Sequence, residues 1–284
     1  MRAVHSSRAR DDHLLSTTRI LSAFIIPFLI VGFGILYLFP DHTHQLFAWT
    51  IRPRMTPMML GSAYLGGAYF FSRAALARRW HLVKAGFLPV ATFAGILGVT
   101  TILHWDRFNH DHISFYVWTV LYFTTPFLVV AVWGSNRRRD PRTAAPGDQT
   151  LPMPTRVAMA VLGVVVLAVS AMLFLSPQTA IGFWPWTLTP LTARVIAAMF
   201  ALGGVGGISV ASDPRWSAAR IPLESQVITL AGVDLAVVFA WPGFSPSNPL
   251  TWVFVGGLLS SLVAMLVLLT LMAARARTSV ATSS

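Results

Sequence analysis

The chain has 284 residues, 55% of them hydrophobic and only 11% charged, and its formal net charge is +11. Because a soluble domain carries about 25% charged residues, this composition excludes an ordinary water-soluble protein and places most of the chain in lipid. The basic residues occupy short segments between apolar runs, as membrane topology requires, so the net charge does not indicate a nucleic acid partner.

The apolar runs predict an all-α fold, a polytopic transmembrane bundle of eight helices. A helix of about 20 residues rises about 30 Å, which is the thickness of the hydrocarbon core. Runs of that length occupy residues 20–39, 58–76, 86–103, 114–133, 157–175, 194–212, 223–240 and 251–273. The first run is too long for the core of a signal peptide, so we expect it to remain as a transmembrane helix.

Several tryptophans fall between these runs, all on one side of the predicted membrane. They are Trp49, Trp105, Trp184, Trp186 and Trp241. Tryptophan is enriched where a membrane protein meets the lipid headgroups, so we expect these side chains to form an interfacial belt. We expect residues 40–57, which surround Trp49, to lie along the membrane surface.

Two parts of the chain repeat the same short patterns. Trp-Thr-x-x-Pro occurs at 49–53 and 186–190, and Leu-Gly-Gly follows at 65–67 and 202–204, always 137 residues apart. We therefore predict a tandem duplication of a four-helix unit. The predicted segments are an N-terminal tail (1–19), a first repeat (20–135), a polar linker (136–154), a second repeat (155–273) and a C-terminal tail (274–284).

The lysines and arginines predict the orientation of both units. The two tails, the 137–156 linker and the turns at 73–84 and 215–220 hold all but four of the 21 basic residues. Basic segments stay in the cytoplasm, so both termini are predicted to be cytoplasmic. Four spans are an even number, and the two repeats should therefore insert the same way up. The arginine-rich composition favours a bacterial protein in the cell membrane.

Glycines mark one predicted helix of each repeat. Gly203 and Gly207 form a G-x-x-x-G pattern, and Gly66-Gly67 stands at the matching position of the first repeat. Small residues let membrane helices approach closely, so we expect the 58–76 and 194–212 helices to be tightly packed and central.

Asp234 is the one acidic residue placed well inside a predicted span. A carboxylate inside the bilayer costs a few kcal/mol and commonly faces a cavity or a partner. Arg194, at the same predicted end of a neighbouring span, is the candidate partner. We interpret Asp234 and Arg194 as a candidate ligand or ion site, and the alternative is a neutral Asp234 or a purely structural pair.

Histidines gather on the predicted outer face of the first repeat. The candidate metal ligands are His42, His44, His104, His110 and His112. Imidazole and carboxylate side chains bind zinc or copper, and Asp41, Asp106 and Asp111 lie close to them in sequence. Their spacing matches no established metal signature, and exposed loops also collect these residues for solubility, so a divalent metal is one of two interpretations.

The sequence gives no indication of several other kinds of functional site. No cysteine is present, which excludes disulfides and thiolate ligands. Paired histidines inside facing spans, which haem b would need, are absent, and so are the sequence motifs of phosphate-binding loops and zinc proteases. No other cofactor is evident. The basic linker residues 137–139 could contact anionic lipid headgroups.

Three functional hypotheses follow. The first is a bundle that binds or translocates a small molecule or ion between its repeats, near Asp234. The second is a membrane enzyme with an extracytoplasmic His/Asp metal site. The third is a non-catalytic subunit or sensor that packs against a protein partner or another copy of itself.

Overall fold

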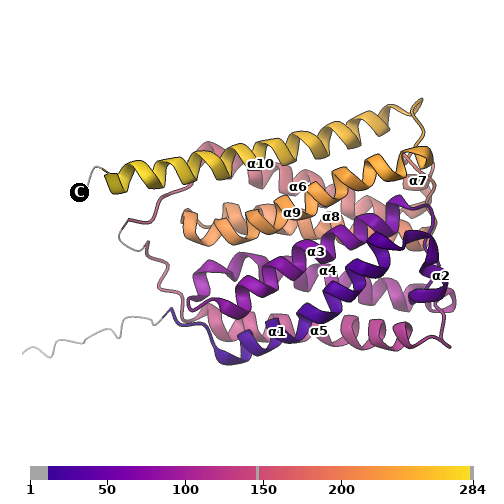
Figure 1. The fold of residues 1–284 in the computed structure, drawn as a ribbon, viewed down its shortest axis with the longest axis horizontal. Helices are drawn as coiled ribbons and strands as arrows, with labels where there is room; N and C mark the ends of the chain where they lie inside the picture. The colour runs from indigo at the N-terminus through magenta and orange to yellow at the C-terminus, as the bar shows by residue number, and fades with distance from the viewer. Residues whose placement is uncertain (1–11, 145–146, 282–284) are drawn as a thin grey trace, which may run out of the picture.

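The computed structural model describes residues 12–144 and 147–281, with side chains up to Arg275. Parts of the predicted tails and the middle of the linker therefore lie outside the described residues. Within them the protein is all-helical, with β-structure limited to three isolated bridges. The long helices run side by side in one bundle (Figure 1).

The long helices are α1 (Ser16–Phe33, continued by the π-helical turn η1, Gly34–Leu38), α3 (Met55–Leu76), α4 (Lys84–Leu103), α5 (Ile113–Arg137), α6 (Met153–Leu175), α8 (Pro190–Ala211), α9 (Trp216–Ala240) and α10 (Pro249–Ala281). Short helical turns connect them: η2 (Pro40–His42), α2 (Thr43–Leu46), η3 (Trp80–Leu82), η4 (Trp105–Arg107), α7 (Pro177–Ile181) and η5 (Trp241–Gly243).

Each apolar run of the sequence falls on one of the long helices. Among the described residues, seven helices are long and apolar enough to cross a membrane: α1 with η1, α4, α5, α6, α8, α9 with η5, and α10. The helix outside this set is α3, which is 22 residues long but carries more polar side chains. Most of α3 is buried against other helices, so its residues need not be as apolar as a lipid-facing surface.

The helix contacts follow the spacing of 137 residues seen in the sequence. In the first half of the chain α1 packs on α3 and α4 packs on α5, and in the second half α6 packs on α8 and α9 packs on α10. The two most extensive contacts between the halves are those of α3 with α9 and of α4 with α8. These four inner helices form the centre of the bundle, with α1 and α5 along one side and α6 and α10 along the other (Figure 1).

One end of the bundle, which we call the linker end, holds residues 77–83, 138–144, 147–152 and 212–215. The chain just before α1 pairs with the turn before α4, and the chain just before α6 pairs with the turn before α9. Asp12 Oδ1 accepts a hydrogen bond from the His81 backbone N–H, and Asp148 Oδ1 accepts one from Ser217, both at 3.2 Å. The same local structure thus occurs twice.

The opposite end, which we call the loop end, holds α2, η4, α7 and η5 (Figure 1). Here the expectation of an interfacial belt is wrong for two of the five tryptophans. Trp49 is 2% exposed and Trp186 is 3% exposed, and both pack in the main hydrophobic core with Phe108 and Phe244 rather than in an interfacial belt. The Trp-Thr-x-x-Pro pattern therefore folds back into the bundle, because burying a tryptophan removes a large apolar surface from water.

The glycine pattern does bring helices together, but Gly204 takes the place expected for Gly203. A Cβ atom on Gly204 would lie 2.8 Å from the Gly163 carbonyl oxygen of α6, and one on Gly207 would lie 3.0 Å from the Met159 carbonyl oxygen. No atom lies within 4 Å of the equivalent point on Gly203. The close approach of α8 to α6 thus depends on Gly204 and Gly207.

Candidate intramembrane binding site

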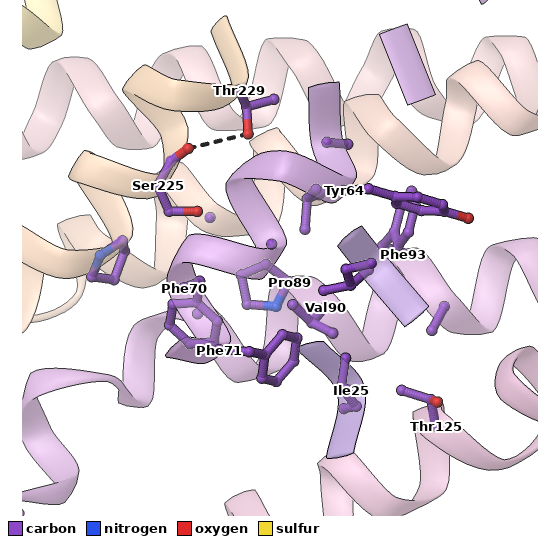
Figure 2. Close-up of a pocket in the computed structure, with 18 of the residues that line it drawn as sticks. Ile25, Tyr64, Phe70, Phe71, Pro89, Val90, Phe93, Thr125, Ser225 and Thr229 are labelled. Carbon is purple, nitrogen blue, oxygen red and sulfur yellow. Dashed lines mark hydrogen bonds between the residues drawn. The ribbon is translucent and has the colours of Figure 1, made fainter. Parts of the chain in front are cut away.

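A cavity of about 120 Å³ lies inside the bundle, among six helices. Its walls come from α1, α3, α4 and α5 of the first half and from α8 and α9 of the second. Figure 2 shows aromatic and aliphatic side chains on one side, among them Phe70, Phe71 and Ile25, with Ser225 and Thr229 of α9 on another. An engineered apolar cavity of about 150 Å³ admits benzene, so this cavity has room for one small ring.

Positions that are 137 residues apart meet in this cavity. Ala85 of α4 corresponds to Pro222 of α9, and Pro89 corresponds to Gln226, and all four residues line it. The cavity is therefore situated where the two halves of the chain face each other. Gly206 of α8 completes the wall beside Pro89, because a Cβ atom at this glycine would be 3.9 Å from Pro89 Cγ.

Four helices around the cavity contain an internal proline. Pro27 lies in α1, Pro89 in α4, Pro126 in α5 and Pro222 in α9. Pro89 and Pro222 line the cavity themselves, whereas Pro27 and Pro126 are each next to a lining residue. Proline removes one helical hydrogen bond and weakens the helix locally, so these helices can bend at the depth of the cavity.

Most polar side chains of the cavity already have partners. Ser225 Oγ donates to the Gly66 carbonyl oxygen at 2.8 Å, and Thr229 Oγ1 donates to the Ser225 carbonyl oxygen at 3.1 Å. The hydroxyl groups of Tyr64 and Tyr122 hydrogen-bond to each other at 2.5 Å. These groups hold the helices together.

Gln226 of α9 is different. Neither its amide N–H groups nor its carbonyl oxygen has a partner among the described residues, and the hydroxyl of Thr125 on α5 is the other unpaired polar group in the cavity wall. No lysine, arginine, histidine or carboxylate is among the described lining residues. The cavity therefore suits an uncharged molecule, and Gln226 can both donate to it and accept from it.

The candidate pair from the sequence is not formed. Arg194 makes no ion pair with Asp234, because its guanidinium donates to the Phe174 carbonyl oxygen at 3.1 Å and contacts His104 Nε2 at 2.6 Å. Asp234 Oδ2 is buried without a hydrogen-bond partner, and Asp234 is not among the residues that line the cavity. Spacing along the chain placed both residues at one end but could not give the direction in which each side chain points.

The five candidate metal ligands are dispersed in the same way. His104 Nε2 is engaged by Arg194, while His112 Nδ1 accepts from the Ser114 backbone N–H at 3.2 Å and caps α5. His110 packs edge-on against Phe115, and His42 packs edge-on against Phe39. Within residues 12–144 and 147–281 no three His, Cys, Asp or Glu side chains are close enough to hold one metal ion, and His44 joins no such group.

A buried ion network at the linker end was not expected from the sequence. Lys84 of α4 contacts Asp140 at 2.6 Å and Asp213 at 2.5 Å, and Arg215 contacts the same two carboxylates at 2.9 and 2.7 Å. Burial opposes ionisation of Asp140, but hydrogen bonds from Arg215 and Lys84 outweigh it and lower its pKa to about 2. The pKa of Asp213 is lowered in the same way. This network joins the first half, the linker and the second half.

Comparisons with known protein families, curated proteins and solved structures give no match. Seven apolar helices of sufficient length indicate a multi-pass integral membrane protein that contacts lipid.

Proposed function

We propose that this protein binds a small, uncharged, largely apolar molecule in the cavity between its two halves, and that it passes the molecule into or across the membrane. The observation that carries the proposal is the unpaired Gln226 amide in an apolar cavity inside the helix bundle. The cavity lies where positions of α4 and α9 that are 137 residues apart face it together. Sites at the interface of structural repeats are common among transporters.

The architecture we propose is a parallel pair of four-helix repeats, in which α3 is the eighth span. The recurrence of helix contacts and of the Asp12 and Asp148 turns supports the duplication. The burial of α3 supports its place as a span, since its neighbours rather than lipid surround it. The concentration of basic residues at the linker end supports a cytoplasmic position for that end.

A pair of reporter fusions tests this orientation. A periplasm-active reporter fused after Arg277 is expected to be silent, and the same reporter inserted in the loop between Ser245 and Asn248 is expected to be active. Activity of the first fusion would contradict the parallel arrangement.

The chemistry of the cavity agrees with an uncharged ligand. Aromatic and aliphatic walls favour apolar surface, and an ion would lose hydration without gaining a charged partner. Prolines in α1, α4, α5 and α9 allow these helices to bend around the ligand, so that it can enter and leave.

Two glycines of α8 give a matched test. Gly206 lines the cavity. Gly203, one turn away, does not line it, and a Cβ atom added there would meet no atom of another helix within 4 Å. Gly206→Leu is expected to fill the cavity, and Gly203→Leu is expected to leave it open.

The measurement is solvent extraction of protein purified in lipid nanodiscs, followed by mass spectrometry. We expect a near-stoichiometric small molecule in the wild type and in Gly203→Leu, and its loss in Gly206→Leu when all three proteins are equally monodisperse. A wild-type protein without such a compound, or equal retention by both variants, would refute the proposed function.

A further inference from the structure

Two polar groups in the cavity wall lack their usual partners, one on α9 and one on α4. On α9 the Gln226 amide has no partner. On α4 the N–H that would satisfy the Ala85 carbonyl oxygen is missing, because residue 89 is a proline four positions later. Ala85, Pro89 and Gln226 all line the cavity.

The remaining polar groups do not compete for a ligand at this point. Ser225 and Thr229 donate to backbone carbonyl oxygens, and the Tyr64 and Tyr122 hydroxyls bond to each other. Thr125 is on the wall formed by α5, away from Ser225 and Thr229 in the view of Figure 2. The cavity wall thus offers the Gln226 amide on α9 and, on α4, a carbonyl oxygen without its helical N–H partner.

A hydroxyl group complements this pair. Its hydrogen can be donated to the Ala85 carbonyl oxygen while its oxygen accepts from the Gln226 amide. A ketone could use only the amide, and a hydrocarbon would leave both groups unpaired in an apolar environment. A carboxylate or an amine would bring a charge to a wall that has no charged side chain.

Size limits the rest of the ligand. The cavity volume of about 120 Å³ and the rings of Phe70, Phe71 and Phe93 around it fit a single ring. We infer that the ligand is an uncharged monocyclic alcohol or phenol, oriented by Gln226 and by the Ala85 carbonyl oxygen. This inference rests on the proposed function, because it specifies the molecule that the same cavity binds.

Two probes of nearly equal shape distinguish the contribution of the hydroxyl group to binding from that of the ring. 4-Fluorophenol and 4-fluorotoluene differ in one hydroxyl or methyl group, and the ¹⁹F NMR signal of each reports the bound molecule separately from the molecule dissolved in lipid. Titrations use the full chain in nanodiscs, and protein-free nanodiscs correct for partition into the bilayer.

We expect the wild type to bind 4-fluorophenol about tenfold more tightly than 4-fluorotoluene after this correction, the size of one well-made hydrogen bond. Gln226→Met is expected to lose this preference and still bind 4-fluorotoluene, which also shows that the variant is folded. Thr125→Val is expected to keep the preference.

The outcomes distinguish this inference from the function it rests on. If the wild type binds both probes equally, or if Thr125→Val rather than Gln226→Met removes the preference, the assigned ligand class is wrong while the cavity still binds small molecules. If the wild type binds neither probe, both this inference and the proposed function are wrong.

Discussion

Two helix pairs join the halves of this protein, and they are held together in opposite ways. Polar contacts cross the α3–α9 pair, where Ser225 donates to the Gly66 carbonyl oxygen and Arg73 pairs with Glu224. Tyr37 of η1, which packs beside α3, donates to the Gly232 carbonyl oxygen of α9 at 2.8 Å. Polar contacts join the α4–α8 pair at its two ends, where Lys84 forms an ion pair with Asp213 and Arg194 contacts His104. Its middle is apolar and borders the cavity.

Positions that correspond in the two halves of the chain therefore have different surroundings. Gly66 and Gly203 are 137 residues apart, yet a Cβ atom at Gly66 would collide with Thr229 and lie 2.8 Å from the Ser225 carbonyl oxygen, whereas Gly203 faces open space. Polar contacts deep in an apolar environment fix the α3–α9 pair rigidly. Between its polar ends the α4–α8 pair packs through apolar side chains, and Pro89 of α4 and Gly206 of α8 border the cavity.

The largest expected effect comes from the two glycines. Gly66→Leu should destabilise the protein by about 3 kcal/mol or prevent folding, because α3 and α9 cannot separate without breaking their hydrogen bonds. Gly203→Leu should change stability by less than about 0.5 kcal/mol. Thermal unfolding in nanodiscs, followed by light scattering, measures the stability of both variants. Equal losses of stability would contradict the proposed difference between the surroundings of Gly66 and Gly203.

Lys84 gives the next largest effect. Lys84→Met leaves Asp140 and Asp213 with Arg215 as their shared cation, and we expect a loss of about 2 kcal/mol at neutral pH. Arg54→Met, which breaks the exposed ion pair with Asp41, is the control and should have almost no effect.

The same network has a defined acid response. The pKa of Asp140 is about 2 in the folded protein against an ordinary 3.8, so its contribution is complete above pH 4 and is lost as the pH falls toward 2. Unfolding temperatures of the wild type should therefore fall across this window, and those of Lys84→Met should fall less. A flat wild-type profile would show that the network contributes no stability.

Equivalent positions in the first turns of α3 and α8 differ in whether they offer a hydrogen-bond acceptor to a tryptophan. Trp186 Nε1 donates to Thr56 Oγ1 at 3.1 Å, while Trp49 Nε1 is buried without an acceptor and the position corresponding to Thr56 is Ala193. Thr56→Val should cost about 1 kcal/mol or more by leaving the Trp186 N–H unpaired. Ala193→Thr should offer an acceptor to Trp49 Nε1, as Thr56 does to Trp186, and so offset part of that loss in the Thr56→Val/Ala193→Thr double variant. A double variant less stable than Thr56→Val would show that position 193 does not face Trp49 as Thr56 faces Trp186.

The smallest effect is expected at His104. Burial first, and then the charges of Arg194 and Arg107, lower its pKa below 6.5, so the unfolded chain takes up a proton before the folded protein does. Stability should be complete above about pH 6.5 and should decrease slightly toward pH 5. His104→Gln keeps an acceptor for Arg194 and should remove this dependence, as unfolding temperatures at both pH values will show.

The corrections to the sequence analysis share one cause. Asp234 and Arg194 were paired because both fall near one end of neighbouring runs, but a difference of 100° per residue around a helix decides what a side chain meets. Trp49 and Trp186 were assigned to an interfacial belt because tryptophan favours the lipid headgroups, whereas both rings are buried in the core. Gln226 lies within the predicted 223–240 span, as Asp234 does. A polar side chain in an apolar span was the feature of the sequence that could have indicated the cavity.

The sequence by itself determined the positions of the long helices and the 137-residue recurrence, because hydrophobic length and repeated patterns are properties of the chain that need no neighbour. Only the tertiary structure decided which of two corresponding glycines is in contact, which partner Arg194 takes and where a cavity remains. Those outcomes depend on the facing surface of a helix distant in sequence, and a few ångströms of separation between helices change a tight contact into a binding site.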